Sequence, residues 1–415
     1  MSGAREDTLD EATARTGTAE PGPLTFNRGT NQSGMRDYNE RLVLTLVRQH
    51  GSLAKSDIAR ITGLSAQTVS VIMRELEAEG LLVKGEPQRG KVGQPSVPMS
   101  LAPEGAFFLG LKIGRRSAEV VLIDFLGAVR GARQHSYPYP TPGQTVDFLM
   151  SAVSDIRGRL AADQDGRIAG LGIAMPFELW SWAEAAGAPQ DVMDQWRDRD
   201  IRAEVQEQVP FPVYLQNDAT SACGAELVFG QIGGLRDFVY FYIGAFAGGG
   251  VVLNGRLCAG RSGNAGALGS MPVPGPSGAP VQLIDVASVA TLERAVCARG
   301  ADASYLWTSP EAWPEIGEPL DRWLEGAGKA LGYAIVAAAA VIDFEAAIID
   351  GWMPPEIKRR LVEAARAATA GIDVEGLHLP EVREGTVGIH ARALGGASLP
   401  LFERFMVGAS SNAAA

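Results

Sequence analysis

The sequence has little cysteine and little histidine, with 3 and 4 of them among 415 residues. Cys223, Cys258 and Cys297 lie 35 and 39 residues apart, which is typical neither of a disulfide framework nor of a zinc site. We therefore expect reduced thiols and no metal centre.

Long hydrophobic runs are absent as well. The longest, residues 330–342, ends at Asp343 and is shorter than the roughly 20 residues of a membrane-spanning helix. The first 30 residues contain five acidic side chains and no apolar stretch, so they do not resemble a secretory signal. We expect a cytoplasmic protein that does not bind membranes.

An excess of positive charge is also lacking, since the net charge is −11. Such a surface as a whole repels nucleic acid. The distribution is uneven, however: residues 36–100 carry nine basic and seven acidic side chains, or +2, against −2 for residues 1–35 and −11 for residues 101–415. Only the 36–100 segment is suited to approach phosphate.

The length of 415 residues predicts two or three folded units, and 46% hydrophobic residues are enough to form their cores. Residues 1–30 are rich in Gly, Ala, Thr, Glu and Pro and are expected to form a disordered tail. Order is expected from about residue 31.

Three short helices are predicted in the basic segment. Apolar side chains recur at helical spacing over residues 37–50, and Gly51 is expected to end this first helix. A second helix begins at Ser56 and ends at Gly63. Ser65 is placed to cap a third, whose buried face is Val69, Ile72, Met73 and Leu76.

The opposite face of the third helix is polar, as in a helix that enters the major groove. We expect DNA contacts from Ser65, Gln67, Thr68, Ser70 and Arg74. Two extended segments follow, joined by a Gly- and Pro-rich loop that contains Arg89 and Lys91, and this pattern predicts a wing. Residues 31–101 are therefore predicted to form a winged helix-turn-helix, although a three-helix bundle with a hairpin and no DNA role shows the same pattern.

The body begins with three apolar segments, residues 107–113, 118–125 and 128–136, which predict an antiparallel meander. Buried strands are expected at 168–174 and 213–216. A helix over 218–229 directly follows a strand, a junction where α/β proteins place ligands.

A second set of strands and helices follows in the body. Strands are predicted at 238–243 and 250–253, with a hairpin turn at Asn254-Gly255. A long Ala-rich helix over about 321–342 precedes a strand at 346–350.

This order, used twice, resembles the actin-like ATPase superfamily, and specific motifs resemble its ROK family of repressors, open reading frames and kinases. In the N-terminal module the matching residues are Gly29, Thr30, Asn31, Gln32, Arg36, Asn39, Ile58, Ala59, Gly63, Leu64, Ser65, Thr68, Val69 and Ser70. In the body they are Gly110, Gly114, Gly172, Ile173, Ala174, Pro176, Asn217, Asp218, Ala219, Gly244, Gly248, Gly250, Asn254, Gly255, Gly266, Asp343 and Gly351. The resemblance implies a winged-helix repressor fused to a sugar-kinase-like sensor.

The phosphate turns depart from the family pattern. The first, Asp-x-Gly-Gly-Thr in the family, has Lys112 at the carboxylate position, and the second carries Phe246 where a phosphate needs room. Asp350 precedes Gly351 in place of a Gly-Gly pair and is expected to put a negative charge near the adenosine position. These departures predict no Mg²⁺ or ATP use, no cofactor and no catalysis.

The sugar site is only partly kept. Asn217 and Asp218 match the family's substrate-binding pair, although Asp218 would equally serve as a helix N-cap. The family's Gly-Glu-x-Gly-His reads Gly-Ala-Leu-Gly-Ser over residues 266–270, and residues 271–281 lack the cysteines of a structural zinc loop. Ser270 and Glu293 are expected as further ligand contacts, and Trp180, Trp182 and Trp196 either stack on a ligand or pack.

We predict an α/β fold with an N-terminal winged helix-turn-helix followed by a two-lobed actin-like domain. The first lobe takes residues 102–220, completed by a C-terminal helix near 388–408, and the second takes 221–387. The expected function is a repressor of carbohydrate-related metabolism that binds double-stranded operator DNA as a homodimer or homotetramer and senses a sugar-like effector. The alternatives are an ATP-dependent carbohydrate kinase with a DNA-binding module, and a ligand-independent DNA-binding protein.

Overall fold

The computed structural model describes residues 32–87 and 97–407. The expected tail over 1–30 and the wing residues Arg89 and Lys91 lie outside these residues. No helix within the described residues has both the length and the hydropathy of a membrane span.

The N-terminal module contains the three predicted helices and a small hairpin. Helices α1 (Gln32–His50), α2 (Lys55–Thr62) and α3 (Ala66–Ala78) precede the antiparallel strands β1 (Leu82–Lys84) and β2 (Met99–Leu101). Gly63 ends α2 with a φ of 72°, a left-handed conformation that glycine adopts without strain. The predicted winged helix-turn-helix is confirmed, with α1 beginning five residues earlier than its apolar periodicity indicated.

The first sheet of the body has the order β5-β4-β3-β6-β7. Strands β3 (Phe107–Ile113), β4 (Ser117–Asp124) and β5 (Val129–Ser136) form the predicted meander, and β6 (Ile168–Met175) and β7 (Val213–Asn217) continue it in parallel. The other elements of this region are η1 (Pro103–Gly105), α4 (Pro142–Arg157), α5 (Ala162–Asp165), η2 (Leu179–Trp182), α6 (Ala183–Ala186), α7 (Gln190–Met193), η3 (Asp194–Trp196) and α8 (Ile201–Gln206).

Alternate residues of β3 enter different cores. Phe107, Leu109 and Leu111 pack with α4 and α8 on one face of the sheet. Phe108 belongs to a core on the other face, together with residues of α15 (Ala391–Phe405) and of the N-terminal module. One continuous hydrophobic core therefore joins the winged helix-turn-helix to the first sheet.

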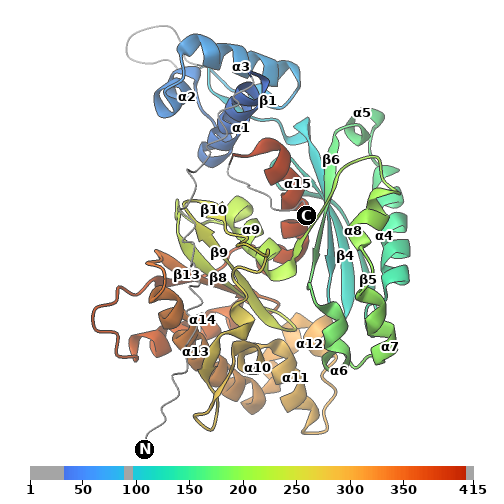
Figure 1. Cartoon of the computed structure of the whole chain (residues 1–415), viewed down its shortest axis with the longest axis vertical. Coiled ribbons are helices and arrows are strands. Elements are labelled where there is room, and N and C mark those ends of the chain that lie inside the picture. The colour runs from blue at the N-terminus through green and yellow to red at the C-terminus, as the bar shows by residue number, and fades with distance from the viewer. Residues whose placement is uncertain (1–31, 88–96, 408–415) are drawn as a thin grey trace, which may run out of the picture.

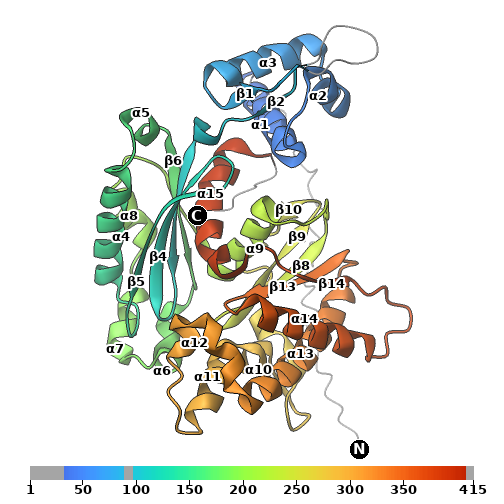
Figure 2. The same ribbon diagram turned by 180° about the vertical axis from the view of Figure 1, so that it is seen from behind.

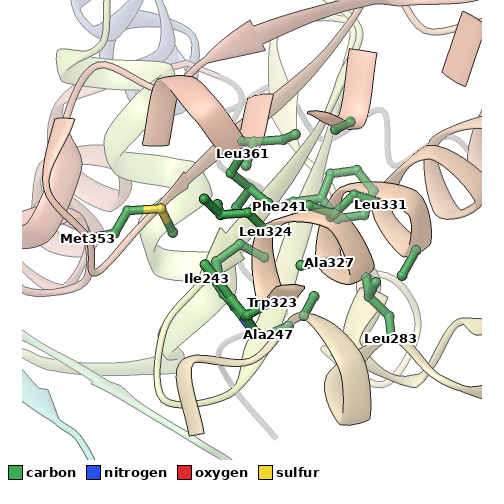
Figure 3. Packing of buried hydrophobic residues seen from close by; sticks show 14 of the residues in the cluster. Phe241, Ile243, Ala247, Leu283, Trp323, Leu324, Ala327, Leu331, Met353 and Leu361 are labelled. Carbon is green, nitrogen blue, oxygen red and sulfur yellow. The ribbon is translucent and has the colours of Figure 1, made fainter. Parts of the chain in front are cut away.

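The second sheet has the order β10-β9-β8-β13-β14. Its strands are β8 (Phe238–Ile243), β9 (Ala247–Leu253), β10 (Arg256–Leu257), β13 (Ala346–Gly351) and β14 (Glu381–Glu384). The predicted turn between β9 and β10 is confirmed, since Asn254 and Gly255 have φ of 55° and 71°. Side chains of β8, such as Phe241, pack against Leu324 of α13 (Glu318–Ala339) and Leu361 of α14 (Pro355–Ala370) (Figure 3).

The remaining elements surround the second sheet. They are α9 (Asp218–Phe229), η4 (Leu268–Ser270), β11 (Pro272–Pro274), β12 (Pro280–Gln282), α10 (Leu283–Ala287), α11 (Val289–Cys297), α12 (Tyr305–Thr308), η5 (Pro310–Ile316) and η6 (Gly388–His390). The domain bounds given above stay a prediction.

Helix α15 lies between the DNA-binding module and the two sheets (Figures 1 and 2). Its backbone approaches the first sheet so closely that an added Cβ at Gly172 of β6 would lie 1.9 Å from the Gly396 carbonyl oxygen. A Cβ at Gly110 of β3 would lie 2.3 Å from the Ala393 oxygen. Glycine at these two strand positions is what allows the helix to sit where it does.

We predict that Gly172→Ala lowers the free energy of unfolding by roughly 3 kcal/mol or more, because α15 must move away from β6. Chemical denaturation measures the change. Gly143→Ala is the matched control: this glycine lies in α4 and an added Cβ there meets nothing within 4 Å, so the change should be neutral or slightly stabilising. Equal effects of the two variants would contradict the close packing.

Candidate functional site

The first candidate site is the exposed start of α3. Ser65 caps the helix, since its Oγ accepts a hydrogen bond from the Thr68 amide at 3.0 Å, and the two hydroxyls lie 2.8 Å apart. Gln67 and Arg74 are exposed on the same helix. The structure thus brings together the described members of the predicted DNA-contacting set, with no covering segment among the described residues.

Lys55 was not anticipated as part of this surface. Its Nζ donates to Ser70 Oγ at 3.3 Å, so an ammonium group from α2 lies beside the polar face of α3. Arg36 on α1 pairs with Glu40 and with Glu75 of α3 at 2.8 and 2.7 Å. The pair with Glu75 joins α1 to α3 beside a shallow groove that Ser65, Gln67 and Thr68 also line.

The module is fastened to the body by buried polar contacts as well as by its core. The Arg48 guanidinium of α1 donates to the Phe125 carbonyl and lies over the Phe229 ring, 5.7 Å from its centroid. Burial lowers the pKa of Arg48 to about 10. Thr45 accepts a hydrogen bond from the Val407 amide at 3.0 Å, directly after α15. A displacement of α15 would therefore act on α1.

The second candidate site lies between the two sheets and has two parts. We call the first part the Asp218 chamber; it measures about 150 Å³ and includes Asn217, Asp218 and Ser270 in its lining. Three of the four predicted ligand residues thus share one cavity. Its volume is below the range of about 300 to 1,000 Å³ that is usual for small-molecule sites.

Asn217, not Asp218, is the N-cap of α9. The Asn217 Oδ1 accepts from the amides of Ala219 and Thr220 at 3.0 and 3.2 Å. Asp218 accepts from the Ala219 amide through Oδ1, at 3.0 Å, and directs Oδ2 to Arg392 of α15, at 3.1 Å. The alternative in which Asp218 is simply the cap is therefore wrong, and the carboxylate is held by a cation 174 residues away.

The aromatic residues near this chamber play different roles. The ring of Trp182 meets that of Phe246 edge to face, with centroids 4.3 Å apart, and both line the Asp218 chamber. Trp196 is buried and donates Nε1 to the Pro140 carbonyl at 3.0 Å, and Trp180 packs against the same core. Of the three tryptophans, Trp182 is the one placed to meet a ligand.

The second part, which we call the Lys112 chamber, measures about 380 Å³. Glu293 lines this chamber and not the Asp218 chamber, so the four predicted ligand residues do not form one site. Its carboxylate is bound by Arg115 at 2.5 Å and accepts from Trp307 Nε1 at 3.2 Å. Arg115 and Arg392 line both chambers.

Lys112 is only 5% exposed, and its Nζ donates to Ser117 Oγ at 2.8 Å. Burial, and next the charge of Arg392, lower its pKa to about 7. The nearby Glu119 is engaged elsewhere, with Oε1 lying 3.1 Å from His390 Nδ1. From the sequence, Lys112 was expected only to replace a metal-binding carboxylate, and nothing in the local pattern indicated its burial.

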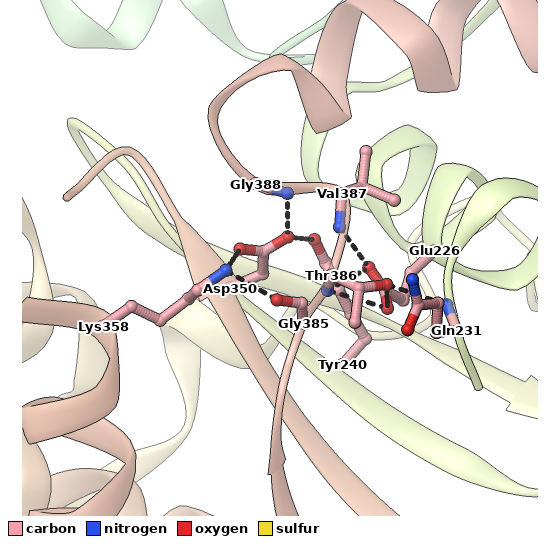
Figure 4. Close-up of polar contacts among 9 residues, drawn as sticks. All are labelled: Glu226, Gln231, Tyr240, Asp350, Lys358, Gly385, Thr386, Val387 and Gly388. Carbon is pink, nitrogen blue, oxygen red and sulfur yellow. Dashed lines mark hydrogen bonds and ion pairs between the residues drawn. The ribbon is translucent and has the colours of Figure 1, made fainter. Parts of the chain in front are cut away.

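Asp350 does not present a free negative charge to the cleft, which corrects the expectation from the sequence. It is fully buried and pairs with Lys358 at 2.9 Å, while its other oxygen accepts from the Gly388 amide at 2.7 Å (Figure 4). Glu226 accepts from the backbone amides of Thr386 and Val387. These two carboxylates fix the segment that leads into α15.

We predict that Lys112→Met raises the free energy of unfolding at pH 7, because a buried ammonium is replaced by an apolar side chain of similar length. At about 1.4 kcal/mol per pKa unit, the gain is on the order of 2 to 4 kcal/mol. Since the folded protein binds fewer protons at Lys112 than the unfolded chain between pH 7 and 10.5, wild-type stability rises relative to the variant in that window. Denaturant titrations at pH 7 and 9.5 measure both effects; a pH-independent difference would contradict the burial.

Two family models match the chain. The model of the ROK family matches residues 108–301, and a model described as winged helix-turn-helix DNA-binding matches residues 36–83.

Curated relatives cover different shares of the chain. Uncharacterized protein y4fQ of Sinorhizobium fredii is 27% identical over 90% of this chain and 93% of its own length. The xylose repressor of Bacillus spizizenii is 25% identical over 59% of this chain and 62% of the repressor. The match to the repressor therefore spans less than two thirds of that protein.

Solved structures share the fold. A ROK family transcriptional regulator described as a homologue of the E. coli MLC protein aligns with a TM-score of 0.64 at 20% identity, over 89% of this chain and 98% of its own. A ROK family glucokinase from Streptomyces griseus, in complex with glucose and AMPPNP, aligns with a TM-score of 0.56 at 21% identity, over 71% and 99%. The two family models thus identify a ROK-family region over residues 108–301 that follows a winged helix-turn-helix over residues 36–83, and the solved structures share the fold of the chain.

Proposed function

We propose that the protein is a transcriptional repressor of carbohydrate-related metabolism that binds operator DNA through α3, and that its ROK region senses a small sugar-like effector without catalysis. The names of the relatives support this, since they include xylose repressors and the DNA-binding transcriptional dual regulator NagC of Escherichia coli. We further propose that it acts in the cytoplasm.

The observation that carries the proposal is the physical path from the cleft to α1. Arg392 near the start of α15 holds Asp218 in the cleft, and Met406 and Val407 at the other end contact Thr45 of α1. A ligand that competes for Asp218 or Arg392 would shift the balance between two positions of α15. It releases DNA only to the extent that it binds the second position more tightly.

Three features of the cleft disfavour the kinase alternative. Lys112 occupies the position of the family's first-turn carboxylate, so the oxygen ligand that would hold Mg²⁺ there is missing. Phe246 fills space in the second turn, against Trp182. The Asp218 carboxylate, which would serve as base, is paired with Arg392. The Asp218 oxygen that accepts from Arg392 is therefore already occupied.

The proposal includes a homodimer or homotetramer. A helix-turn-helix reads two half-sites about one helical turn apart only when a two-fold axis relates two copies. The same symmetry would let one effector-bound subunit influence its neighbour.

We predict that Gln67→Ala relaxes base preference at one operator position, with a loss of roughly 1 to 3 kcal/mol in discrimination, because glutamine pairs with the edge of adenine. Arg74→Ala is the control on the same helix; it should weaken specific and random DNA alike and reduce the salt slope by about 1. Fluorescence anisotropy with matched and mismatched duplexes measures both. An equal loss for Gln67→Ala on all duplexes rejects a base-reading role.

The proposed function is tested by binding of the full chain to DNA from its own upstream region, titrated with sugars, sugar acids, polyols and ATP. We predict that at least one sugar-like compound weakens DNA binding about tenfold or more, that ATP has no sugar-dependent turnover, and that Asp218→Asn reduces the response. Tight DNA binding that no metabolite changes would favour the ligand-independent alternative, and sugar-dependent ATP hydrolysis that requires Asp218 would favour the kinase.

A further inference from the structure

The Lys112 chamber has an excess of positive charge within an acidic protein. Four cationic side chains line it, namely Lys112, Arg115, Arg116 and Arg392, against the two carboxylates Glu293 and Asp302. The cations come from β3, the β3–β4 turn and α15, so the fold brings them together from distant parts of the sequence. In a chain with a net charge of −11, such a local concentration of cations is unusual.

The carboxylates of the region neutralise these cations only in part. Glu293 is shared by Arg115 and Arg116, at 2.5 and 3.7 Å, and Asp218 pairs with Arg392 at 3.1 Å. Lys112 has no carboxylate within ion-pair distance among the described residues and is satisfied only by the hydroxyl of Ser117. A buried ammonium with a single neutral partner is costly unless an anion joins it.

Two guanidinium groups also keep unused donors. The Nε atoms of Arg115 and Arg392 are buried and lack an acceptor in the described part of the chain. These side chains are only 9% and 11% exposed. Buried donors without partners are unfavourable, so both guanidinium groups gain from a rearrangement that gives these donors an acceptor oxygen.

Size and the remaining lining point to the class of molecule. The volume of about 380 Å³ falls within the usual range for small-molecule sites, unlike that of the Asp218 chamber. Gln134, Ser136, Ser304 and Thr308 add neutral hydrogen-bonding groups to the wall. Trp307 and Tyr137 supply aromatic surface, which suits the apolar face of a sugar ring.

We propose that the Lys112 chamber binds the anionic group, phosphate or carboxylate, of a hydroxylated metabolite, with Lys112, Arg116 and Arg392 as its cationic contacts. The inference deepens the proposed function, because it assigns the effector to the class of sugar phosphates or sugar acids. The Asp218 chamber, which shares Arg115 and Arg392 with this site, then holds at most a small neutral part of the ligand.

Ligand charge also bears on the protonation of Lys112. The charged groups that face it are Arg392 of α15, Glu119 of β4 and Asp218 of α9, with His390 beside Glu119. With its pKa lowered to about 7, Lys112 is largely neutral at pH 8. An anion bound beside it stabilises the ammonium form, so binding at pH 8 takes up a proton.

The test is isothermal titration calorimetry on the full chain with glucose, glucose 6-phosphate, gluconate, inorganic phosphate and ATP. We expect glucose 6-phosphate or gluconate to bind at least about tenfold more tightly than glucose. We also expect a proton uptake at pH 8, measured in two buffers of different ionisation enthalpy. Comparison of the affinities for glucose 6-phosphate and gluconate shows whether the site prefers a phosphate or a carboxylate. Tighter binding of ATP than of every sugar compound would overturn the assignment to a sugar metabolite.

Lys112→Met should abolish both the tighter binding of anionic sugars over glucose and the proton uptake. Lys329→Met is the control, because Lys329 is exposed on α13. The inference is overturned if no anion binds, or if anions bind Lys112→Met as tightly as wild type with the same proton uptake. It fails separately from the proposed function. If a neutral sugar releases DNA and no anion binds, the proposed sensor function stands and the anion site is rejected. If an anion binds without any effect on DNA, the anion site stands and the sensor function is rejected.

Discussion

The close contact of α15 with β3 and β6 is the constraint on which the arrangement of this protein depends. Gly110 and Gly172 on the strands and Gly396 on the helix leave no room for a Cβ between the two backbones. The helix is thereby brought into the core that contains α1 and α3 residues such as Val43 and Val69. Its first turn, in consequence, places Arg392 between the two chambers of the cleft. The last helix in the sequence is thus the element shared by the DNA-binding module, the first sheet and the cleft.

Buried ionic groups fix the start of this helix. Asp350 of β13 and Glu226 of α9 bind the backbone of the segment that precedes α15. Burial raises the pKa of Glu226, while its hydrogen bonds from Thr386 and Val387 act in the opposite direction. A network that depends on buried charges favours a small number of discrete positions over a continuous range. That property suits a helix that has to report the state of the cleft to α1.

Much of the fold follows from local patterns in the sequence. The cap at Ser65, the stop at Gly63 and the turn at Asn254-Gly255 are each set by residues within a few positions, and all were predicted. The site was harder, because its decisive contacts join distant residues. Arg392 pairs with Asp218, 174 positions away in the sequence. The ion pair of Asp350 with Lys358 and its hydrogen bond from the Gly388 amide likewise depend on the tertiary fold. The charge of an isolated residue indicates a role, but only the fold shows whether that charge is already paired.

Helix α15 joins the cleft to the DNA-binding surface. Hydrogen–deuterium exchange of the full chain, with and without operator DNA, tests this connection without knowledge of the effector. We predict altered protection in α15 and in residues 385–388, in addition to α1 and α3, because a change in α1 is transmitted through Thr45 and Val407. Changes confined to residues 32–101, with α15 and residues 385–388 unaffected, would contradict it.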